Sequence, residues 1–480
     1  MRTLVFSAAL IVAGTGLAAQ QVDPALSLIT SEPPKVDREV VELGKMLFFD
    51  ARLSGDGSTA CVDCHDPDYG WSDGSELARG YPGTKHWRNS QSIVNVGYVG
   101  GGLHWDAGLA SLNDQVIDAM GAGFVSNIDT VLAEERLRQI PDYVSRFKAI
   151  WGETPNMPRI AEAIATFEMS LISENSPYDQ YMAGQRSALS QDALRGLELF
   201  NGKANCSSCH NGKLMSDMQF HNVSVPPNPS LAEDPLRQVT FRYLMRNLDV
   251  EPEIYDALDR DPGRYLSTKD PQDLGKFRTP PLRYLKYTAP YMHNGVFYTL
   301  EEVVEFYNVG GTQDVFQTKS PLLQPLNLSR QEKQALVAFL ESMSGSEIKV
   351  KQPELPDYEA LAFPAASLNL AALEQAPEPA PTSNAEPEVT VPASSGLSMT
   401  LRDTGSPYAT AETPAVADNP SRIKDIGGTL YVTVEEGDTL GDLARVIYGD
   451  PLQYRRLYEA NRDNLRNPND VRKGMLLRIP

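Results

Sequence analysis

The chain of 480 residues holds all four of its cysteines in two short motifs, each followed directly by a histidine. The residues are Cys61, Cys64 and His65 in the first motif, and Cys206, Cys209 and His210 in the second. The spacing C-x-x-C-H is typical of c-type haem attachment, in which two thiols bond the porphyrin and the imidazole binds the iron. A zinc site and a thioredoxin-like redox pair are the alternatives. The adjacent histidines, and the use of every cysteine, favour two covalently bound haem c groups.

Helices must position the first motif, because the apolar residues around it recur with helical spacing. We assign residues 20–185 to this N-terminal haem region. The pattern predicts helices over residues 41–50, 112–120, 133–151 and 158–172. No sustained alternation of apolar and polar residues indicates a strand in this region.

The second motif lies in a region that we place at residues 186–348, and this region is also predicted to be helical. A helix that begins after Ser190 leads into the motif. Two later helices have complete capping boxes, in which two side chains three positions apart satisfy backbone amides at the start of the helix. The pairs are Thr299 with Glu302, and Ser329 with Glu332. The predicted fold class is therefore mainly α.

The start of the chain is typical of a secretory signal peptide. Residues 1–19 contain Arg2, then an apolar run, then small residues ending in two alanines. The apolar run is too short to span a bilayer, and no other stretch is long and apolar enough to do so. We therefore expect an exported chain with no membrane span after removal of the signal, located in the periplasm.

The chain is strongly acidic, with a formal net charge of −20 from 63 acidic and 43 basic residues. This charge argues against nucleic acid as a partner. It suits a basic electron donor, because opposite fields steer encounter, and it suits equally a surface charge that only confers solubility. The sequence leaves the oligomeric state open, a homodimer included.

Composition changes near residue 350, where apolar periodicity ends. Residues 349–428 are rich in Pro, Ala, Ser, Thr and Glu, which predicts a disordered linker. Residues 429–480 regain order in a predicted β-α-α-β pattern. Its strands cover residues 430–434 and 475–479, and its second helix covers residues 451–461.

Several stretches, taken in order, resemble the bacterial di-haem cytochrome c peroxidase and MauG superfamily. They are the two haem motifs and residues 43–54, 88–89, 105–106, 112–115, 273–283, 288–295 and 299–302. The resemblance implies two cytochrome c-like haem domains. The N-terminal haem would react with peroxide and the C-terminal haem would transfer electrons. Residues 430–480 resemble a LysM module, which implies a small domain that binds peptidoglycan.

The resemblance also implies roles for individual residues. Trp105 matches an electron relay between the haems, and Gln115 matches a residue that orients peroxide. His65 and His210 match the proximal iron ligands. A calcium site would be formed by Asn89 with the carbonyl groups of Thr288 and Pro290, and such hard oxygen ligands suit Ca²⁺.

Tyr307 matches the distal ligand of the second haem, where typical peroxidases have methionine and MauG-like members have tyrosine. It lies on the apolar face of its predicted helix with Leu300, Val303 and Val304, so it is either a core aromatic or an iron ligand. A phenolate lowers the haem potential relative to methionine. Met292 and His293 are the alternative ligands.

Two features of typical peroxidases have no match. The gating histidine before Arg88 is missing, and the sequence does not decide whether the offset His86 closes the first haem. The acidic residue past Gln115 falls near Val125, so Asp118 or Asp129 would need a shifted register. Because O–O cleavage needs a proton donor, the sequence does not show which residue supplies it.

Three functional hypotheses remain open. The first is a periplasmic peroxidase that reduces hydrogen peroxide to water with electrons from a small cytochrome c or copper protein, and that is tethered to the cell wall. The second is a MauG-like enzyme that uses high-valent di-haem iron to oxidise residues of a partner protein. The third is a wall-tethered electron carrier without peroxide chemistry.

Overall fold

The computed structural model describes residues 34–360, except positions 83, 100, 101 and 257, and parts of 422–480, which exclude 436–439, 441–442, 444–446, 449–453 and 466–470. It divides into two compact units, residues 1–359 and 360–480. The expected signal peptide and most of the expected linker lie outside the described residues. Within the described part of the chain, no helix has the length and apolarity to cross a membrane.

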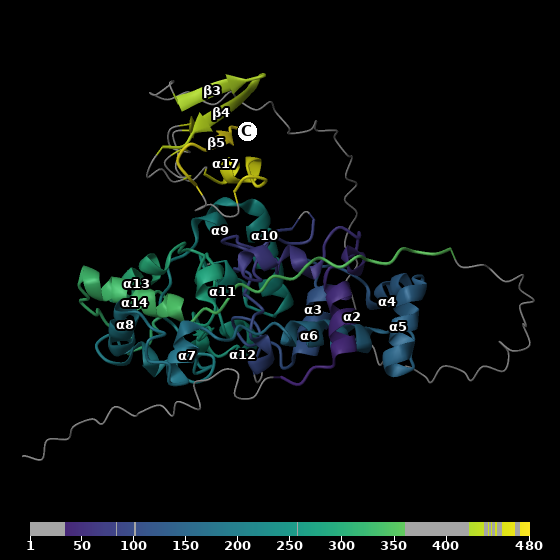
Figure 1. Cartoon of the computed structure of the whole chain (residues 1–480), viewed down its shortest axis with the longest axis horizontal. Helices are drawn as coiled ribbons and strands as arrows, with labels where there is room; N and C mark the ends of the chain where they lie inside the picture. The colour runs from purple at the N-terminus through teal and green to yellow at the C-terminus, as the bar shows by residue number, and fades with distance from the viewer. Residues whose placement is uncertain are drawn as a thin grey trace, which may run out of the picture. The chain divides into compact units, whose positions relative to one another are not determined.

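The first haem region is organised around two helices that cross closely, α2 (Arg38–Phe48) and α6 (Met157–Met169) (Figure 1). Gly44 permits the close approach, because a Cβ atom there would overlap the carbonyl oxygen of Ala163. Phe48 and Phe167 meet edge to face next to the crossing, with ring centroids 5.1 Å apart. The region also contains α3 (Leu112–Gly121), α4 (Thr130–Arg138) and α5 (Pro141–Trp151).

The second haem region repeats this arrangement with α8 (Gln191–Asn201) and α14 (Arg330–Ser342), which lie side by side in Figure 1. Here Gly196 faces the carbonyl group of Ala335. Phe200 and Phe339 meet edge to face at 5.1 Å. Each residue of this set lies at the same helical offset as its counterpart in the first region, so the two regions share one packing unit.

The remaining elements of the first unit connect or cover these two helix pairs. They are α7 (Pro177–Met182), β1 (Phe220–His221), α9 (Pro229–Glu233), α10 (Pro235–Asn247), α11 (Pro252–Tyr255), α12 (Tyr265–Thr268), β2 (Phe277–Arg278) and α13 (Leu300–Asn308). The strands β1 and β2 pair antiparallel. Apolar residues of α10 and α12 pack with Trp87, which belongs to the first region. We call residues 229–268, which hold α9 to α12, the inserted segment, and this segment packs against the first haem region.

Most predicted helices are confirmed within one to three residues of their predicted ends. Thr299 and Ser329 begin α13 and α14 with the expected capping boxes. The single helix predicted over residues 133–151 is wrong, because the chain forms α4 and α5 instead. Pro141 begins α5, and a residue before proline is driven away from the helical conformation.

Residues 348–359 lie against the first haem region, although composition assigned most of them to the linker. The indole nitrogen of Trp71 donates to the Ile348 carbonyl at 3.0 Å. Arg52 donates to the Pro356 carbonyl at 2.7 Å, and the side chain of Gln139 donates to Glu359. We call residues 348–359 the strap.

The second unit contains a three-stranded antiparallel sheet in the order β3-β4-β5, with β3 (Ile423–Ile426), β4 (Thr429–Thr433) and β5 (Leu476–Arg478). The strands β4 and β5 and the helix α17 (Tyr454–Ala460) fall where the sequence predicted them. The sequence did not predict β3, which turns into β4 through Gly427 and Gly428, both with positive φ. One apolar cluster joins the sheet to Leu443, Ile447 and Leu457.

Candidate functional site

The first motif forms a short 3-10 helix, η3 (Cys61–Asp63), that presents both cysteines and His65 from a single turn. The His65 amide donates to the Cys61 carbonyl at 3.0 Å. The Nδ1 atom of His65 lies 3.1 Å from the carbonyl oxygen of Trp71. A carbonyl can only accept, so Nδ1 carries the proton and Nε2 keeps the lone pair that binds a metal.

The second motif has the same geometry in η6 (Cys206–Ser208). The His210 amide donates to the Cys206 carbonyl at 2.9 Å, and Nδ1 of His210 lies 3.0 Å from the Met215 carbonyl oxygen. The two residues that provide these carbonyl groups, Trp71 and Met215, both have positive φ. The backbone is thus held in a rare conformation at each centre, and this orients both imidazoles for iron.

Burial keeps these groups uncharged. It raises the pKa of Cys64 and of Cys206 to about 12 each. It lowers the pKa of His210 to about 4, and the carbonyl of Met215 opposes that shift. The imidazole is therefore neutral near pH 7, which is the form that ligates iron.

A cavity of about 290 Å³ lies beside the second motif, lined by Cys206, Cys209, His210, Tyr307 and mostly apolar residues. Tyr307 points into it from α13, on the helix face predicted from the sequence. Burial, followed by the proximity of Cys206 and Cys209, raises the pKa of Tyr307. The cavity's apolar walls, two thiols and one imidazole fit a covalently attached haem. Met292 and His293 line the same cavity, so they remain alternative ligands.

Trp105 lies in the wall of this cavity and is itself buried. Its indole nitrogen donates to the Asn89 carbonyl at 3.1 Å, and its ring meets that of His293 edge-on at 6.4 Å. Its own carbonyl accepts from the amide of Arg278. The indole is therefore fixed between the segment that follows the first motif and the second cavity.

The three residues of the expected calcium site, Asn89, Thr288 and Pro290, all line the second cavity. The Asn89 amide nitrogen donates to the Ser75 carbonyl at 2.8 Å, which directs that side chain's nitrogen away from a cation. Gln115 lies half-buried on α3 and does not line this cavity. The calcium set and Trp105 thus line one cavity, and Gln115 does not.

His86 stacks on Trp87 with ring centroids 4.2 Å apart, and its Nδ1 accepts from the amide of Arg88 at 3.0 Å. Burial lowers its pKa to about 3. Asp129 is occupied as the N-cap of α4, accepting from the Leu132 amide. These contacts engage one ring nitrogen of His86 and one carboxylate oxygen of Asp129.

Two titratable residues were missed by sequence reasoning. His104 precedes Trp105 with positive φ, and its charge would repel a proton on His65; its position beside Trp105 was the available signal. Glu168 on α6 is buried, its Oε2 has no partner among the described residues, and burial raises its pKa to about 8. It acts electrostatically on Cys61. A buried carboxyl oxygen without a hydrogen-bond partner beside the first motif is consistent with a cofactor bound at this site.

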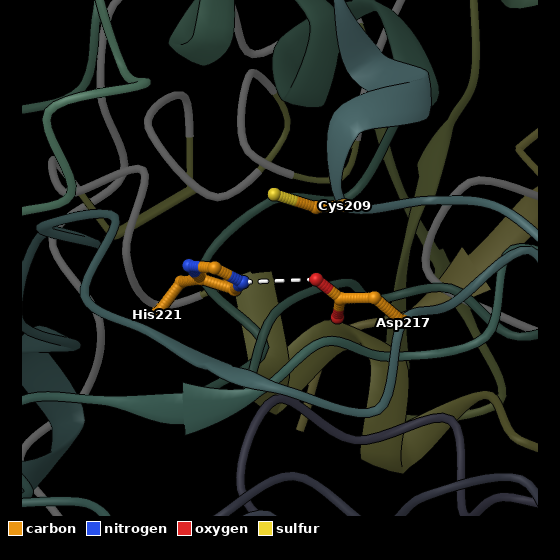
Figure 2. Close-up of side chains that lie close together, drawn as sticks. All are labelled: Cys209, Asp217 and His221. Atoms are coloured by element: carbon orange, nitrogen blue, oxygen red, sulfur yellow. Dashed lines mark hydrogen bonds and ion pairs between the residues drawn. The ribbon is translucent and has the colours of Figure 1, made fainter. Parts of the chain in front are cut away.

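A further cluster lies at the second motif, shown in Figure 2, where donor atoms of Cys209, Asp217 and His221 lie within 4.8 Å of one another. His221 Nε2 is 3.1 Å from an Asp217 carboxylate oxygen. Such a set could hold a soft metal. However, Cys209 is the second cysteine of a haem motif, and a thioether supplies no thiolate. The pair Asp217 and His221 therefore belongs to the edge of the second haem site.

Comparison with known proteins agrees with this geometry. The family described as di-haem cytochrome c peroxidase matches residues 38–187. The chain is 48% identical over 344 residues to cytochrome-c peroxidase IdrP1 of Denitromonas iodatirespirans, covering 71% of this chain and 90% of that protein. It is 33% identical to methylamine utilization protein MauG of Methylorubrum extorquens, over 66% of this chain and 82% of that protein.

Similarity to a MauG-like protein is also found among solved structures. The crystal structure of a MauG-like protein associated with microbial copper homeostasis aligns with a TM-score of 0.55 at 29% identity, over 65% of this chain and 91% of that one. The chain belongs to the di-haem cytochrome c peroxidase and MauG family and is a peroxidase-like oxidoreductase with two covalently bound haem c groups.

Proposed function

We propose that this protein is a periplasmic peroxidase that reduces hydrogen peroxide to water with electrons from a small cytochrome c or copper protein. The observation that carries the proposal is Trp105, which lies in the wall of the second cavity and is bonded to the segment after the first motif. An aromatic ring at this position suits a relay between an electron-accepting and a peroxide-reducing centre.

The chain's own residues would orient the groups and move protons. The bound haems supply the iron and the electron storage. Trp71 and Met215 hold His65 and His210 in the metal-binding tautomer. Gln115 orients peroxide beside the first haem. Reduction of peroxide to two waters consumes two protons as well as two electrons, so an acid must act near this haem. Glu168 and His104 are the candidates on the first-haem side.

Steady-state turnover tests this proposal. The full chain with both haems should oxidise reduced small cytochrome c when hydrogen peroxide is added, and Trp105→Phe should slow turnover while both haems remain attached. An inert protein would support instead the third hypothesis, an electron carrier.

The first haem is proposed to be open to small ligands in the oxidised protein, since His86 is stacked on Trp87 and bonded to the Arg88 amide. Cyanide should therefore bind without prior reduction. Binding that appears only after one-electron reduction would indicate a gating residue.

A MauG-like oxidation of a partner protein is the second candidate, and Tyr307 favours it. This tyrosine occupies the second cavity together with His210, where a phenolate ligand would lower the haem potential. The two candidates differ in which protein the peroxide finally oxidises. It is the electron-donor protein in the first candidate and the partner protein in the second. Slow peroxide turnover with reduced cytochrome c, accompanied by stoichiometric oxidation of an added protein, would favour this candidate.

The second unit is proposed to be a LysM module that binds peptidoglycan, with residues 361–421 as the tether. Support comes from the β4-α17-β5 order, the apolar cluster of the unit and the motifs quoted above. The full chain should co-sediment with purified peptidoglycan, whereas a chain that ends at residue 360 should not. Equal sedimentation of both would refute wall binding.

A calcium ion is proposed at Asn89, Thr288 and Pro290, which all line the second cavity. Removal of calcium by a chelator should alter the spectra of both haems, and added Ca²⁺ should restore them. Unchanged spectra and a calcium content of zero in the purified protein would refute the site.

A further inference from the structure

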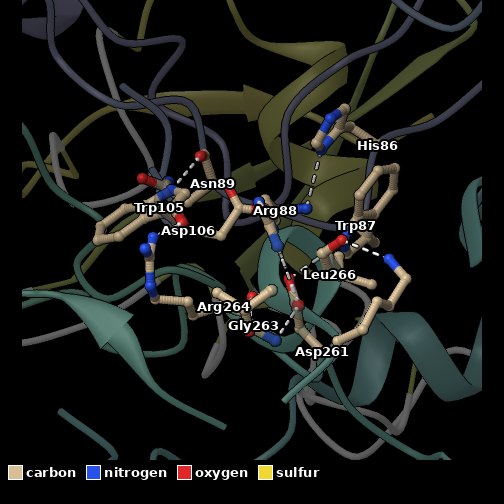
Figure 3. Close-up of polar contacts among 12 residues, drawn as sticks. His86, Trp87, Arg88, Asn89, Trp105, Asp106, Asp261, Gly263, Arg264 and Leu266 are labelled. Carbon is tan, nitrogen blue, oxygen red and sulfur yellow. Dashed lines mark hydrogen bonds and ion pairs between the residues drawn. The ribbon is translucent and has the colours of Figure 1, made fainter. Parts of the chain in front are cut away.

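Arg88 is a buried cation that connects three distant parts of the chain (Figure 3). Its guanidinium group makes a bidentate pair with Asp261, through Nε at 2.5 Å and a second nitrogen at 3.1 Å. Its remaining nitrogen lies 3.2 Å from a carboxylate oxygen of Asp106. Both carboxylates are buried, so each needs this cation to offset its desolvation.

The carboxylate of Asp261 accepts two further hydrogen bonds besides those from Arg88. It accepts from the indole nitrogen of Trp87 at 3.1 Å and from the Gly263 amide at 2.8 Å. Burial would raise the pKa of Asp261, but the adjacent Arg88 holds it below its ordinary value. The carboxylate therefore stays charged, and the inserted segment provides a rigid anchor for Arg88.

The Arg88–Asp106 ion pair is one of two adjacent links between the same two segments. The other joins the neighbours of these residues, since the indole of Trp105 donates to the carbonyl of Asn89. Figure 3 shows both links side by side. Two adjacent links fix both the orientation of a loop and its distance from the segment that it contacts. Here the loop is the one that carries Trp105. Arg264 adds a bond to the Asp106 carbonyl at 2.8 Å.

We propose that Arg88 is a positioning residue for Trp105, which it holds through Asp106 against the anchor at Asp261. The inference rests on the proposed relay role of Trp105. Removal of the guanidinium would leave Asp106 and Asp261 buried without their ion-pair partner, and the loop would relax toward solvent. The indole would then lose its fixed place between the two haem sites.

The test is the rate of electron transfer between the haems, followed optically after flash reduction of the oxidised full-length protein. Arg88→Lys keeps the charge but cannot form the bidentate pair. It should slow the transfer on the order of tenfold, since small displacements of a reacting group cost one to two orders of magnitude. Asp106→Asn is milder and should slow the transfer by a smaller factor.

A double variant separates positioning from general loss of stability. Arg88→Lys should have no further effect in a Trp105→Phe background, because the residue it positions is gone. Arg52→Lys is the matched control: Arg52 makes a bidentate pair with the buried Asp50, remote in sequence from Trp105. It should lower the melting temperature without changing the inter-haem rate.

Three outcomes overturn the proposal in different ways. If Trp105→Phe alone keeps the wild-type rate, the relay role is wrong, and the positioning role with it. If Trp105→Phe is slow but both Arg88→Lys and Asp106→Asn are normal, only the positioning role is wrong. An equal slowing by Arg88→Lys in both backgrounds would show that Arg88 acts independently of Trp105.

Discussion

In each haem region the helix before the motif crosses a later helix at a glycine, Gly44 in the first and Gly196 in the second. The aromatic pairs beside the crossings have the same separation and nearly the same interplanar angle, 61° and 63°. In both regions a residue with positive φ presents its carbonyl group to the imidazole. The two haem regions therefore use the same scaffold to hold the cofactor.

The side chains around the two motifs differ. The residue after Phe339 is Leu340, which lines the second cavity. The residue after Phe167, at the equivalent helical position, is the buried acid Glu168. Tyr307 provides a hydroxyl to the second centre, and the strap accepts the indole proton of Trp71 at the first. The packing unit is therefore general, and single substitutions on it give each centre its own chemistry.

The largest effect is expected from the helix crossings. Gly44→Val and Gly196→Val should each destabilise their own haem region by about 3 kcal/mol or more, because the added carbons collide with backbone that cannot move. Denaturant unfolding, with the absorbance of each haem as the probe, measures this. Gly121→Val serves as control, since a Cβ there would meet no atom within 4 Å outside its chain neighbours and its own helix backbone. Unequal losses in the free energy of unfolding would show that the two helix crossings are not equivalent.

The next effect concerns Tyr307. Tyr307→Phe should change the spin state of the second haem and leave the first unaltered, because the phenol would no longer reach the iron. Electron paramagnetic resonance detects the change. Tyr291→Phe is the matched control, since Tyr291 lines the same cavity but its hydroxyl already donates to the Leu285 carbonyl. An unchanged spectrum in Tyr307→Phe would exclude the ligand role.

The strap should matter only to the first centre. A chain that ends at residue 347 loses the acceptor of the Trp71 indole, and Trp71 orients His65. We expect a loss of about 2 kcal/mol for the first haem region, typical of a buried donor left unpaired. A chain that ends at residue 360 should match the full protein in thermal unfolding monitored at both haems. Equal stability of both truncated chains would contradict the role of the strap.

The smallest effect is a pH dependence confined to the first region. Burial raises the pKa of Glu168 from its usual 4.5 to about 8, so the folded state keeps a proton that the unfolded chain releases. The free energy of unfolding should therefore fall as the pH rises from about 4.5 to about 8. Glu168→Gln should remove this slope, with a gain at pH 8 of at least about 1 kcal/mol.

The control is Glu162→Gln, on the same helix but paired with Arg159 at the surface. It should leave the slope intact. A Glu168→Gln protein that retains the wild-type pH dependence would show that another group titrates.

The sequence alone predicts the haem motifs, most helix ends and the apolar helix face that carries Tyr307. These depend on spacing, capping and helical period, which are local properties of the chain. It did not reveal the break at Pro141, although the proline was visible, because the apolar pattern continues across it.

Which buried polar groups meet depends on the three-dimensional fold. Arg88, Asp106 and Asp261 are far apart in the chain and carry no shared motif, yet they form one buried cluster. The carbonyl partners of His65 and His210, the strap on Trp71 and the isolation of Glu168 are likewise products of packing. The physical reason is that burial and pairing depend on what surrounds a residue in space, and local spacing carries no record of that.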